Sequence, residues 1–221
     1  ILKKIDNWSC SKANPVVVHS LDMKKSLKSR NTKNKFKIKI INNFSVSSEK
    51  LNKSMLKKNL KLESNKLTII FAGNLGRFQA LDKIIEAMAI LKNVKDIKLI
   101  LVGEGSVKSD LIFKIKSSNA NVEIFDSQPI DTTKEMIKKA DIGLVSLDKN
   151  IYKYAYPGKI MTYLQQGKPI IAILEKKSEI VKLMENENYG FCIPTLEPKK
   201  ISQHLIKILE NQSWKYKMGS N

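Results

Sequence analysis

The stretch Phe71-Ala-Gly-Asn-Leu-Gly-Arg77 constrains this chain most, because it connects a strand pattern to a helix pattern. Residues 67–72 form an apolar run, and residues 81–91 carry apolar side chains at helical spacing. Glycines allow a backbone to approach an anion, and a helix N-terminus offers unpaired N–H groups. Arg77 adds a forked, permanently charged donor to a chain whose only other arginine is Arg30. The stretch is either a plain strand-to-helix turn or a loop that binds a phosphate.

Short β-branched runs alternate with helical periods from residue 67 onward, which predicts an α/β domain. Several of the runs are apolar throughout, as expected of parallel strands covered on both faces. The pattern therefore predicts a doubly wound, mostly parallel sheet. The expected strands are 67–72, 98–102, 122–125, 142–147, 169–173 and 190–193, and the expected helices are 81–91, 106–117, 132–139, 159–166, 178–185 and 198–210.

The first 44 residues do not fit this alternation, because strand patterns at 15–18 and 36–41 flank a lysine-rich helical stretch with no sheet to join. We interpret residues 1–44 as the end of a second, partial α/β domain. Residues 45–66 are polar and lysine-rich, which is typical of an interdomain linker. Residues 67–221 then form the main domain. These boundaries predict a fragment of a longer two-domain protein.

Positive charge is concentrated at the front of the chain. Residues 1–66 hold 17 basic and 4 acidic residues, an excess of 13 out of the total net charge of +19. Such a front can contact an anionic membrane surface, or it can reflect lysine used as an ordinary surface residue. Nucleic acid is a weaker hypothesis, because no aromatic-studded basic strand, zinc finger or recognition helix accompanies the charge. We expect no nucleic-acid partner.

Cysteine and histidine spacing indicates no metal site. Cys10 and Cys192 lie far apart, and neither His19 nor His204 is close to them in sequence. We interpret both histidines as surface or packing residues, and we expect a reducing compartment. The longest apolar runs are far shorter than the roughly 18 residues that a transmembrane helix needs.

Two further segments carry chemistry at expected strand ends. Pro157 can begin a helix, so Gly158 and Lys159 would present N–H groups and a cation, with Thr162 on the same helix face. Gly103 and Glu104 follow another strand. Open α/β sheets bind ligands at the carboxyl ends of their strands. Together with the glycines near Arg77, these segments favour an anion site at this edge, although ordinary helix starts and a capping role for Glu104 remain alternatives.

Several of these segments occur in the order seen in a known family. The sequences Phe71-Ala-Gly-Asn-Leu-Gly, Leu-Val-Gly-Glu-Gly at 101–105, and Tyr156-Pro-Gly-Lys-Ile-Met-Thr-Tyr-Leu-Gln-Gln-Gly-Lys-Pro-Ile-Ile171 resemble family-four GT-B glycosyltransferases. The resemblance covers about residues 10–219 and is strongest with bacterial enzymes of surface-polysaccharide synthesis. It implies that 67–221 is a Rossmann-like, nucleotide-sugar donor-binding domain and that 1–44 belongs to the acceptor-side domain.

The resemblance also assigns residues to the donor. It places the loop containing Gly73, Asn74, Gly76, Arg77 and Gln79 at the diphosphate, with Gly103 and Glu104 in the same cleft and Gly158 and Lys159 at a helix start that faces the donor. Many relatives have arginine at the position of Asn74 and lysine at that of Gln79. We therefore expect Arg77 and Lys159 to supply the charge.

A second departure concerns ribose recognition. The family's paired glutamates align with Tyr154 and Thr162, so neither carboxylate is present. Thr162 is nevertheless carried over as a donor-binding residue. The missing carboxylates favour an alternative hypothesis, a non-catalytic nucleotide-binding module derived from such an enzyme.

By resemblance, the reaction is transfer of a hexosyl or N-acetylhexosaminyl group, with retention, from a nucleoside-diphosphate sugar to an acceptor hydroxyl. A UDP-sugar is the expected donor, a lipid-linked or other glycan the expected acceptor, and no cofactor or metal is implied. We expect a cytoplasmic location, with the basic front able to contact the inner face of the cell membrane. The fragment alone is expected to be inactive, because the cleft needs both domains.

Overall fold

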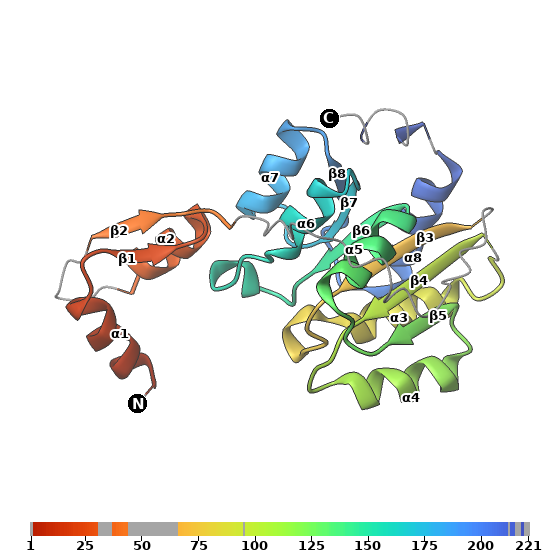
Figure 1. Cartoon of the computed structure of the whole chain (residues 1–221), viewed down its shortest axis with the longest axis horizontal. Coiled ribbons are helices and arrows are strands. Elements are labelled where there is room, and N and C mark those ends of the chain that lie inside the picture. Colours follow the sequence, from red (N-terminus) through yellow and green to blue (C-terminus); the bar gives the residue numbers. More distant parts are fainter. Residues whose placement is uncertain are drawn as a thin grey trace.

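The computed structural model describes residues 2–30, 37–43, 66–94, 96–211, 213, 214 and 218. The predicted linker, 45–66, lies outside the described residues except for Lys66. The main domain alternates strands and helices along the chain, as Figure 1 shows. Its elements are β3 (Leu67–Ala72), η2 (Arg77–Gln79), α3 (Leu81–Ile90), β4 (Ile97–Val102), α4 (Lys108–Ser118), β5 (Val122–Phe125), α5 (Ile130–Lys139), β6 (Ile142–Ser146), η3 (Ile151–Lys153), α6 (Lys159–Gln165), β7 (Ile170–Ile173), α7 (Glu179–Asn186), β8 (Gly190–Cys192) and α8 (Pro198–Glu210).

Six parallel strands form the sheet, in the order β5-β4-β3-β6-β7-β8. The first strand of the domain lies in the middle, with β4 on one side and β6 on the other. This is the doubly wound order. The chain adds β4 and β5 on one side of β3, and then adds β6, β7 and β8 on the other side. The switch point between β3 and β6 is where such sheets bind ligands. The predicted fold class is confirmed.

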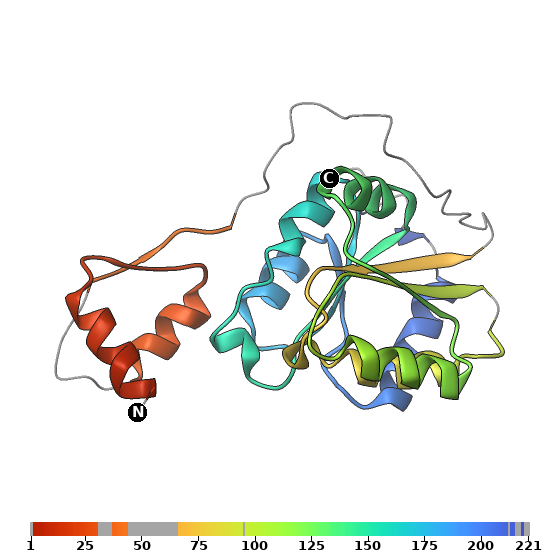
Figure 2. The same ribbon diagram turned by 60° about the horizontal axis from the view of Figure 1, so that its bottom comes forward.

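Alternate strand residues build two cores, because neighbouring side chains in a strand point to opposite faces. Leu67, Ile69 and Phe71 pack with α3, α4 and α8, whereas Ile70 and Ala72 pack with α5, α6 and α7. Figure 2 shows α5 above β3 and β4, and α4 below them. All residues of β3, β4, β6 and β7 are buried, which explains why these strands are mainly apolar, with Thr68, Lys98 and Ser146 as their buried polar residues.

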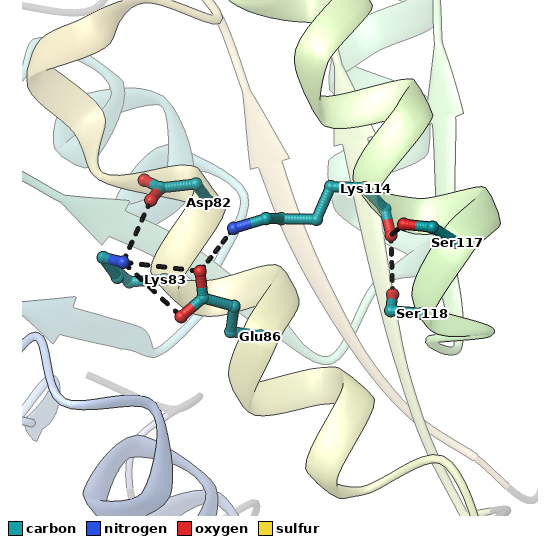
Figure 3. Close-up of polar contacts among 6 residues, drawn as sticks. All are labelled: Asp82, Lys83, Glu86, Lys114, Ser117 and Ser118. Carbon is teal, nitrogen blue, oxygen red and sulfur yellow. Dashed lines mark hydrogen bonds and ion pairs between the residues drawn. The ribbon is translucent and has the colours of Figure 1, made fainter.

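Ion pairs join α3 to α4 on the outer surface. Glu86 on α3 accepts hydrogen bonds from Lys83, one turn away, and from Lys114 on α4 (Figure 3). The Lys114 hydrogen bond is the main reason that the pKa of Glu86 lies below its usual value. Partly exposed pairs of this kind each contribute about 1 kcal/mol or less, so they adjust the packing of the two helices rather than create it.

The N-terminal residues form a smaller unit. Its elements are α1 (Leu2–Lys12), β1 (Val16–Val18), α2 (Leu21–Lys28) and β2 (Ile38–Ile40). The two strands pair with each other in parallel, which gives the predicted strand-helix-strand pattern a sheet of its own. Helix α1 was not among the expected elements. Within the described residues, no helix has the length and hydropathy needed to cross a membrane.

Two helix starts hold this unit against the main domain. Ser20 caps α2 and Ser178 caps α7, each through its own side chain. The Glu179 carboxylate then accepts the Leu21 N–H of α2 at 2.6 Å, while the Asp22 carboxylate accepts the Glu179 N–H of α7 at 2.7 Å. Each helix thus receives a carboxylate from the other at its positively polarised end. We call these two bonds the reciprocal caps.

Replacing Asp22 by alanine should weaken the attachment of the two units. The Glu179 N–H would lose its acceptor, and loss of a helix cap costs about 0.5–2 kcal/mol. We expect the amide of Glu179 to exchange with solvent at least about fivefold faster, measured by hydrogen exchange. Asp110→Ala is the matched control, because Asp110 also lies in the first turn of an exposed helix, α4. Unchanged exchange at Glu179 in Asp22→Ala would contradict the reciprocal caps.

Candidate functional site

A cavity of about 410 Å³ opens at the carboxyl ends of β3, β4 and β5, beside the start of α6. Of the residues proposed from sequence, the structure brings six together in its wall. They are Gly73, Asn74, Gly103, Glu104, Lys159 and Thr162. The other lining residues come from β3, β4, α6 and the segment that includes the start of α5, namely Ala72, Val102, Ser127, Gln128, Ile130, Thr133, Lys134, Ile137 and Tyr163.

Glycines allow the strand-end loops of this cavity to pack backbone to backbone. A side chain on Gly103 would place its Cβ 2.0 Å from the Gly73 carbonyl oxygen, and one on Gly105 would lie 2.2 Å from the Leu75 carbonyl oxygen. Gly103 also has a φ of 151°, in the region that favours glycine. Leu75 N–H donates to the Glu104 carbonyl at 2.7 Å. These glycines therefore have a packing role, which fixes the wall of the cavity.

Lys159 is one of the two lysines that line the cavity, and the other is Lys134. The Nζ of Lys159 lies 3.1 Å from the centre of the Phe71 ring, and a Cβ added to Gly73 would be 3.3 Å from that Nζ. A cation over an aromatic face is attracted by the ring's electrons. Burial lowers the pKa of Lys159 from its usual value of 10.5 to about 7, and no carboxylate among the described residues offsets this effect. The cavity therefore presents a partly buried lysine that is about half protonated near pH 7 and has no carboxylate partner in the described part of the chain.

Glu104 is engaged by a neighbouring lysine. Its carboxylate accepts a hydrogen bond at 2.6 Å from Lys108, the first residue of α4, and Lys108 also pairs with Asp126. The two carboxylates raise the pKa of Lys108, Asp126 contributing more than Glu104. Ser127 N–H lies 3.4 Å from the Glu104 carboxylate. Glu104 thus links the loops after β4 and β5 at the rim of the cavity.

Four residues proposed from sequence do not line the cavity. Gly76 is buried in the turn, where its N–H donates to the Gln79 side chain at 3.1 Å. Arg77 is exposed at the start of η2. Gly158 lies beside Asn43 of the N-terminal unit. The turn η2 intervenes between the glycines and α3, so the free N–H groups of α3 begin at Leu81 rather than at the glycine loop.

Sequence analysis missed the side of the cavity that follows β5. Ser127, Gln128 and Thr133 supply polar groups there, and Ile130 and Ile137 supply apolar surface. The position of β5 was predicted, so the rule that ligands bind at the carboxyl edge could have identified residues just after Phe125. A smaller cavity of about 230 Å³ lies at the ends of β6, β7 and β8, lined mainly by apolar residues.

Other reactive side chains lie outside this cavity. Nδ1 of His19 donates to the Ile41 carbonyl and Nδ1 of His204 to the Lys200 carbonyl, at 3.0 and 2.8 Å. Burial raises the pKa of the Cys192 thiol to about 11, so little reactive thiolate forms near neutral pH. Across the described segments, no cluster of three or more potential metal ligands is present.

Residues 52–221 match the family model described as "Glycosyl transferases group 1", which covers more than half of the chain. The chain belongs to the group 1 glycosyltransferases. This family corresponds to GT4 enzymes with the GT-B fold, as the sequence resemblance implied. The six-stranded parallel sheet described above matches the C-terminal domain of the GT-B fold in these enzymes.

Curated relatives of this glycosyltransferase chain are distant. It is 26% identical over 141 residues to the probable glycosyltransferase WbjE of Pseudomonas aeruginosa, covering 63% of this chain and 35% of the relative. It is 28% identical over 148 residues to the putative colanic acid biosynthesis glycosyl transferase WcaI of Escherichia coli, covering 66% and 35%. A shorter match, 37% identical over 83 residues, links 38% of the chain to 36% of the Methanocaldococcus jannaschii protein FdhD. The matches thus span about a third of each relative's length.

Solved structures share the fold of this glycosyltransferase. Anabaena HepE, solved with UDP and glucose, superposes with a TM-score of 0.73 at 17% identity, covering 100% of this chain and 60% of HepE. The sucrose-phosphate synthase of Thermosynechococcus elongatus gives the same TM-score at 17% identity, covering 98% of this chain and 54% of the synthase. At these identities the likeness shows the fold.

The buried ammonium predicts a pH dependence of stability. Lys159 in the folded chain has a pKa near 7, below its unfolded value, so between pH 7 and about 10 the unfolded chain binds more protons. Stability contributed by this site should therefore rise with pH over that interval and be lowest below pH 7. We expect the free energy of unfolding of the wild type to rise relative to that of Lys159→Met, by at most about 1.4 kcal/mol per pH unit. Urea unfolding of both proteins at several pH values measures the difference, and parallel pH curves would contradict it.

Proposed function

We propose that the cavity binds the diphosphate and nucleoside of a sugar-nucleotide donor, and that the full-length protein transfers the sugar to an acceptor hydroxyl with retention. One observation carries the proposal: the desolvated ammonium of Lys159, without a carboxylate partner among the described residues, lies at the switch point of the sheet. Family membership supports a nucleotide-sugar donor. A UDP-sugar carrying a hexosyl or N-acetylhexosaminyl group is our proposed substrate.

The reaction breaks the bond between the anomeric carbon of the sugar and the diphosphate oxygen, and forms a bond from that carbon to the acceptor oxygen, whose O–H bond breaks as its proton passes to the departing diphosphate. Negative charge develops on the departing diphosphate. Fixed donors that face this charge stabilise the transition state more than the ground state. We propose Lys159 as the main such donor, because an ammonium held in a partly dry site interacts with an anion more strongly than one in water does.

Other residues of the cavity have proposed supporting roles. Gly73, Asn74 and Gly103 form the loop wall that the diphosphate approaches, and Thr162 lies on α6 with Lys159. Glu104, paired with Lys108, is proposed to border the sugar or ribose. The apolar surface of Ile130 and Ile137 suits the flat base. Gly76, Gln79 and Gly158 act indirectly in this proposal, because the structure places them in the loops that support the wall.

A nucleotide panel tests the proposal directly. We expect UDP to raise the melting temperature of the 221-residue chain more than GDP, dTDP, CMP or NAD does, since ligand at 100 times its Kd adds about 2.7 kcal/mol. Lys159→Met should weaken UDP binding at least tenfold, equal to about 1.4 kcal/mol, because one charge-assisted hydrogen bond is lost. Lys159→Arg, which keeps the charge, should retain more of the affinity. Absence of any nucleotide-induced shift in the wild type would reject donor binding by this chain.

Arg77 provides an independent comparison within the same assay. We propose it as a second cation for the diphosphate, although its side chain is exposed on η2 and does not line the cavity. Arg77→Ala should weaken UDP binding about tenfold if the loop folds over the ligand as a unit with η2. Unchanged affinity would remove Arg77 from the site. We expect no sugar transfer by the chain alone, since the acceptor side of the cleft is contributed by the other domain of a GT-B fold.

A lipid-linked or glycan acceptor at an anionic membrane surface is also proposed. The N-terminal unit exposes Lys4 and Lys12 on α1, together with Ile5 and Trp8, which are 56% and 64% exposed. Basic residues are attracted to anionic lipid, and tryptophan favours the membrane interface.

Vesicle binding tests this surface. We expect the chain to sediment with vesicles that contain anionic phospholipid and to be released as salt rises from about 0.1 M to about 1 M, because salt screens exposed charges. Vesicles of neutral phosphatidylcholine are the control. Binding that ignores both salt and lipid charge would contradict an electrostatic contact.

A further inference from the structure

The sheet is split between its two central strands at the end that carries the cavity. Strand β3 pairs with β6 at two positions, Ile69 with Ile142 and Ile70 with Gly143. Both strands continue toward the carboxyl edge, where β3 pairs with β4 as far as Ala72. On the β6 side, the backbone groups beyond Ile70 therefore need partners other than the neighbouring strand.

The hydroxyl of Tyr163 bridges this split. It accepts a hydrogen bond from the Ala72 N–H at 2.9 Å and donates one to the Leu144 carbonyl at 3.3 Å. Ala72 lies at the end of β3, and Leu144 lies on β6 just past the last paired residue. One side-chain oxygen on α6 thus replaces a rung of the sheet.

The sequence makes room for this side chain. Tyr163 is fully buried, and its ring lies on Gly143, where an added Cβ would be 2.4 Å from the ring. Burial raises the pKa of the Tyr163 hydroxyl far above its usual range, so the proton needed for the bond to Leu144 is retained. The glycine in β6 and the tyrosine on α6 form a matched pair at the switch point.

The same helix carries Lys159, one of the two lysines that line the cavity. Lys159 precedes Tyr163 by one helical turn, and its ammonium lies over Phe71, the residue before Ala72 in β3. Two successive residues of β3 therefore contact two side chains of α6, one through the ring of Phe71 and one through the N–H of Ala72. This two-point contact fixes the end of β3 relative to α6.

We propose that Tyr163 is a positioning residue of the donor site, whose hydroxyl anchors α6 to the split strands and so holds the Lys159 ammonium beside Gly73. The proposal rests on the proposed donor-binding function of that ammonium. Phe71 packs with the core on the α3 side of the sheet, whereas Tyr163 packs on the opposite side with α6. The Lys159 ammonium lies over the ring of Phe71 and beside Gly73, so it contacts a residue of the opposite core, and in this proposal the tyrosine hydroxyl holds α6 where that contact is possible.

The variant Tyr163→Phe tests this role, because it keeps the ring and removes only the hydroxyl. We expect UDP to bind at least about fivefold more weakly to the 221-residue chain, measured by calorimetry well below the melting temperature. We also expect Lys159 to titrate at least about one pH unit higher than in the wild type, followed by NMR of the labelled lysine side chain, because a loosened α6 admits water to the ammonium. A purely structural role would lower the melting temperature and leave both readouts unchanged.

Trp214→Phe is the control for general destabilisation. The Trp214 indole N–H donates to the Ile208 carbonyl in the core on the other face of the sheet, and Trp214 does not line the cavity. We expect this variant to melt at a lower temperature with UDP affinity and Lys159 titration unchanged. Equal losses of affinity in Trp214→Phe and Tyr163→Phe would overturn the proposal.

A second variant covers the case in which Tyr163→Phe does not fold. Gly143→Ala keeps the hydroxyl but displaces the ring on which it depends, and a stabilising osmolyte can support its folded state. The same two readouts should change, and a folded Gly143→Ala with unchanged affinity and titration would overturn the proposal. If the wild type binds no nucleotide, the proposed function fails, while the Lys159 titration in the variants still decides the role of Tyr163.

Discussion

Burial of the central strands on both faces is the constraint on which the rest of this structure depends. Every residue of β3 and β4 is removed from solvent, so both faces of these strands are committed to the core. Buried backbone groups must find hydrogen-bond partners, and the strand ends find them in loops that pack directly on one another. Glycines at 103 and 105 permit this contact. The hollow between these loops and α6 is the cavity, so the site is a consequence of how the sheet closes its edge.

Lys159 shows the energetic cost of that arrangement. An ammonium transferred out of water is destabilised unless an opposite charge or a hydrogen bond replaces the lost hydration. The Phe71 ring supplies only part of that replacement. An anionic ligand would replace the rest of the lost hydration. Ligand binding would therefore also remove the free-energy cost of burying the ammonium. A site of this kind lowers the stability of the free protein in favour of affinity for its ligand.

The sequence predicted the main domain closely because its signals were of the most reliable kinds. Strands buried on both faces appear as mainly apolar runs, and α3 and α8 show apolar side chains on one helical face. Helix α1 was missed because its apolar residues are few, and Ile5 and Trp8 are exposed in the structure.

At the site, six of the residues predicted from sequence line the cavity. They were identified from the glycines and from the rule that ligands bind at the carboxyl ends of parallel strands. The contacts of Lys159 with Phe71 and of Tyr163 with Ala72 could not be foreseen, because they depend on where β3 and β6 separate. Arg77 was predicted to be in the site because it is close to the glycines in sequence, but it does not line the cavity.

The reciprocal caps have a consequence for the order in which the chain can mature. Leu21 and Glu179 are 158 residues apart, so the final acceptor for the first turn of α2 does not exist until most of the chain has been synthesised. Until then, the N-terminal unit presents a polarised helix end to water, and it can complete its contacts only after α7 has formed. Contacts this distant in sequence form late, because the intervening chain must first be ordered. Docking of the two units therefore marks a chain whose main domain is already folded. In a ribosome-bound or truncated chain that lacks α7, Ser20 would still cap α2, but the Leu21 N–H would have no carboxylate acceptor, and that free N–H would distinguish it from a chain with α7 in place.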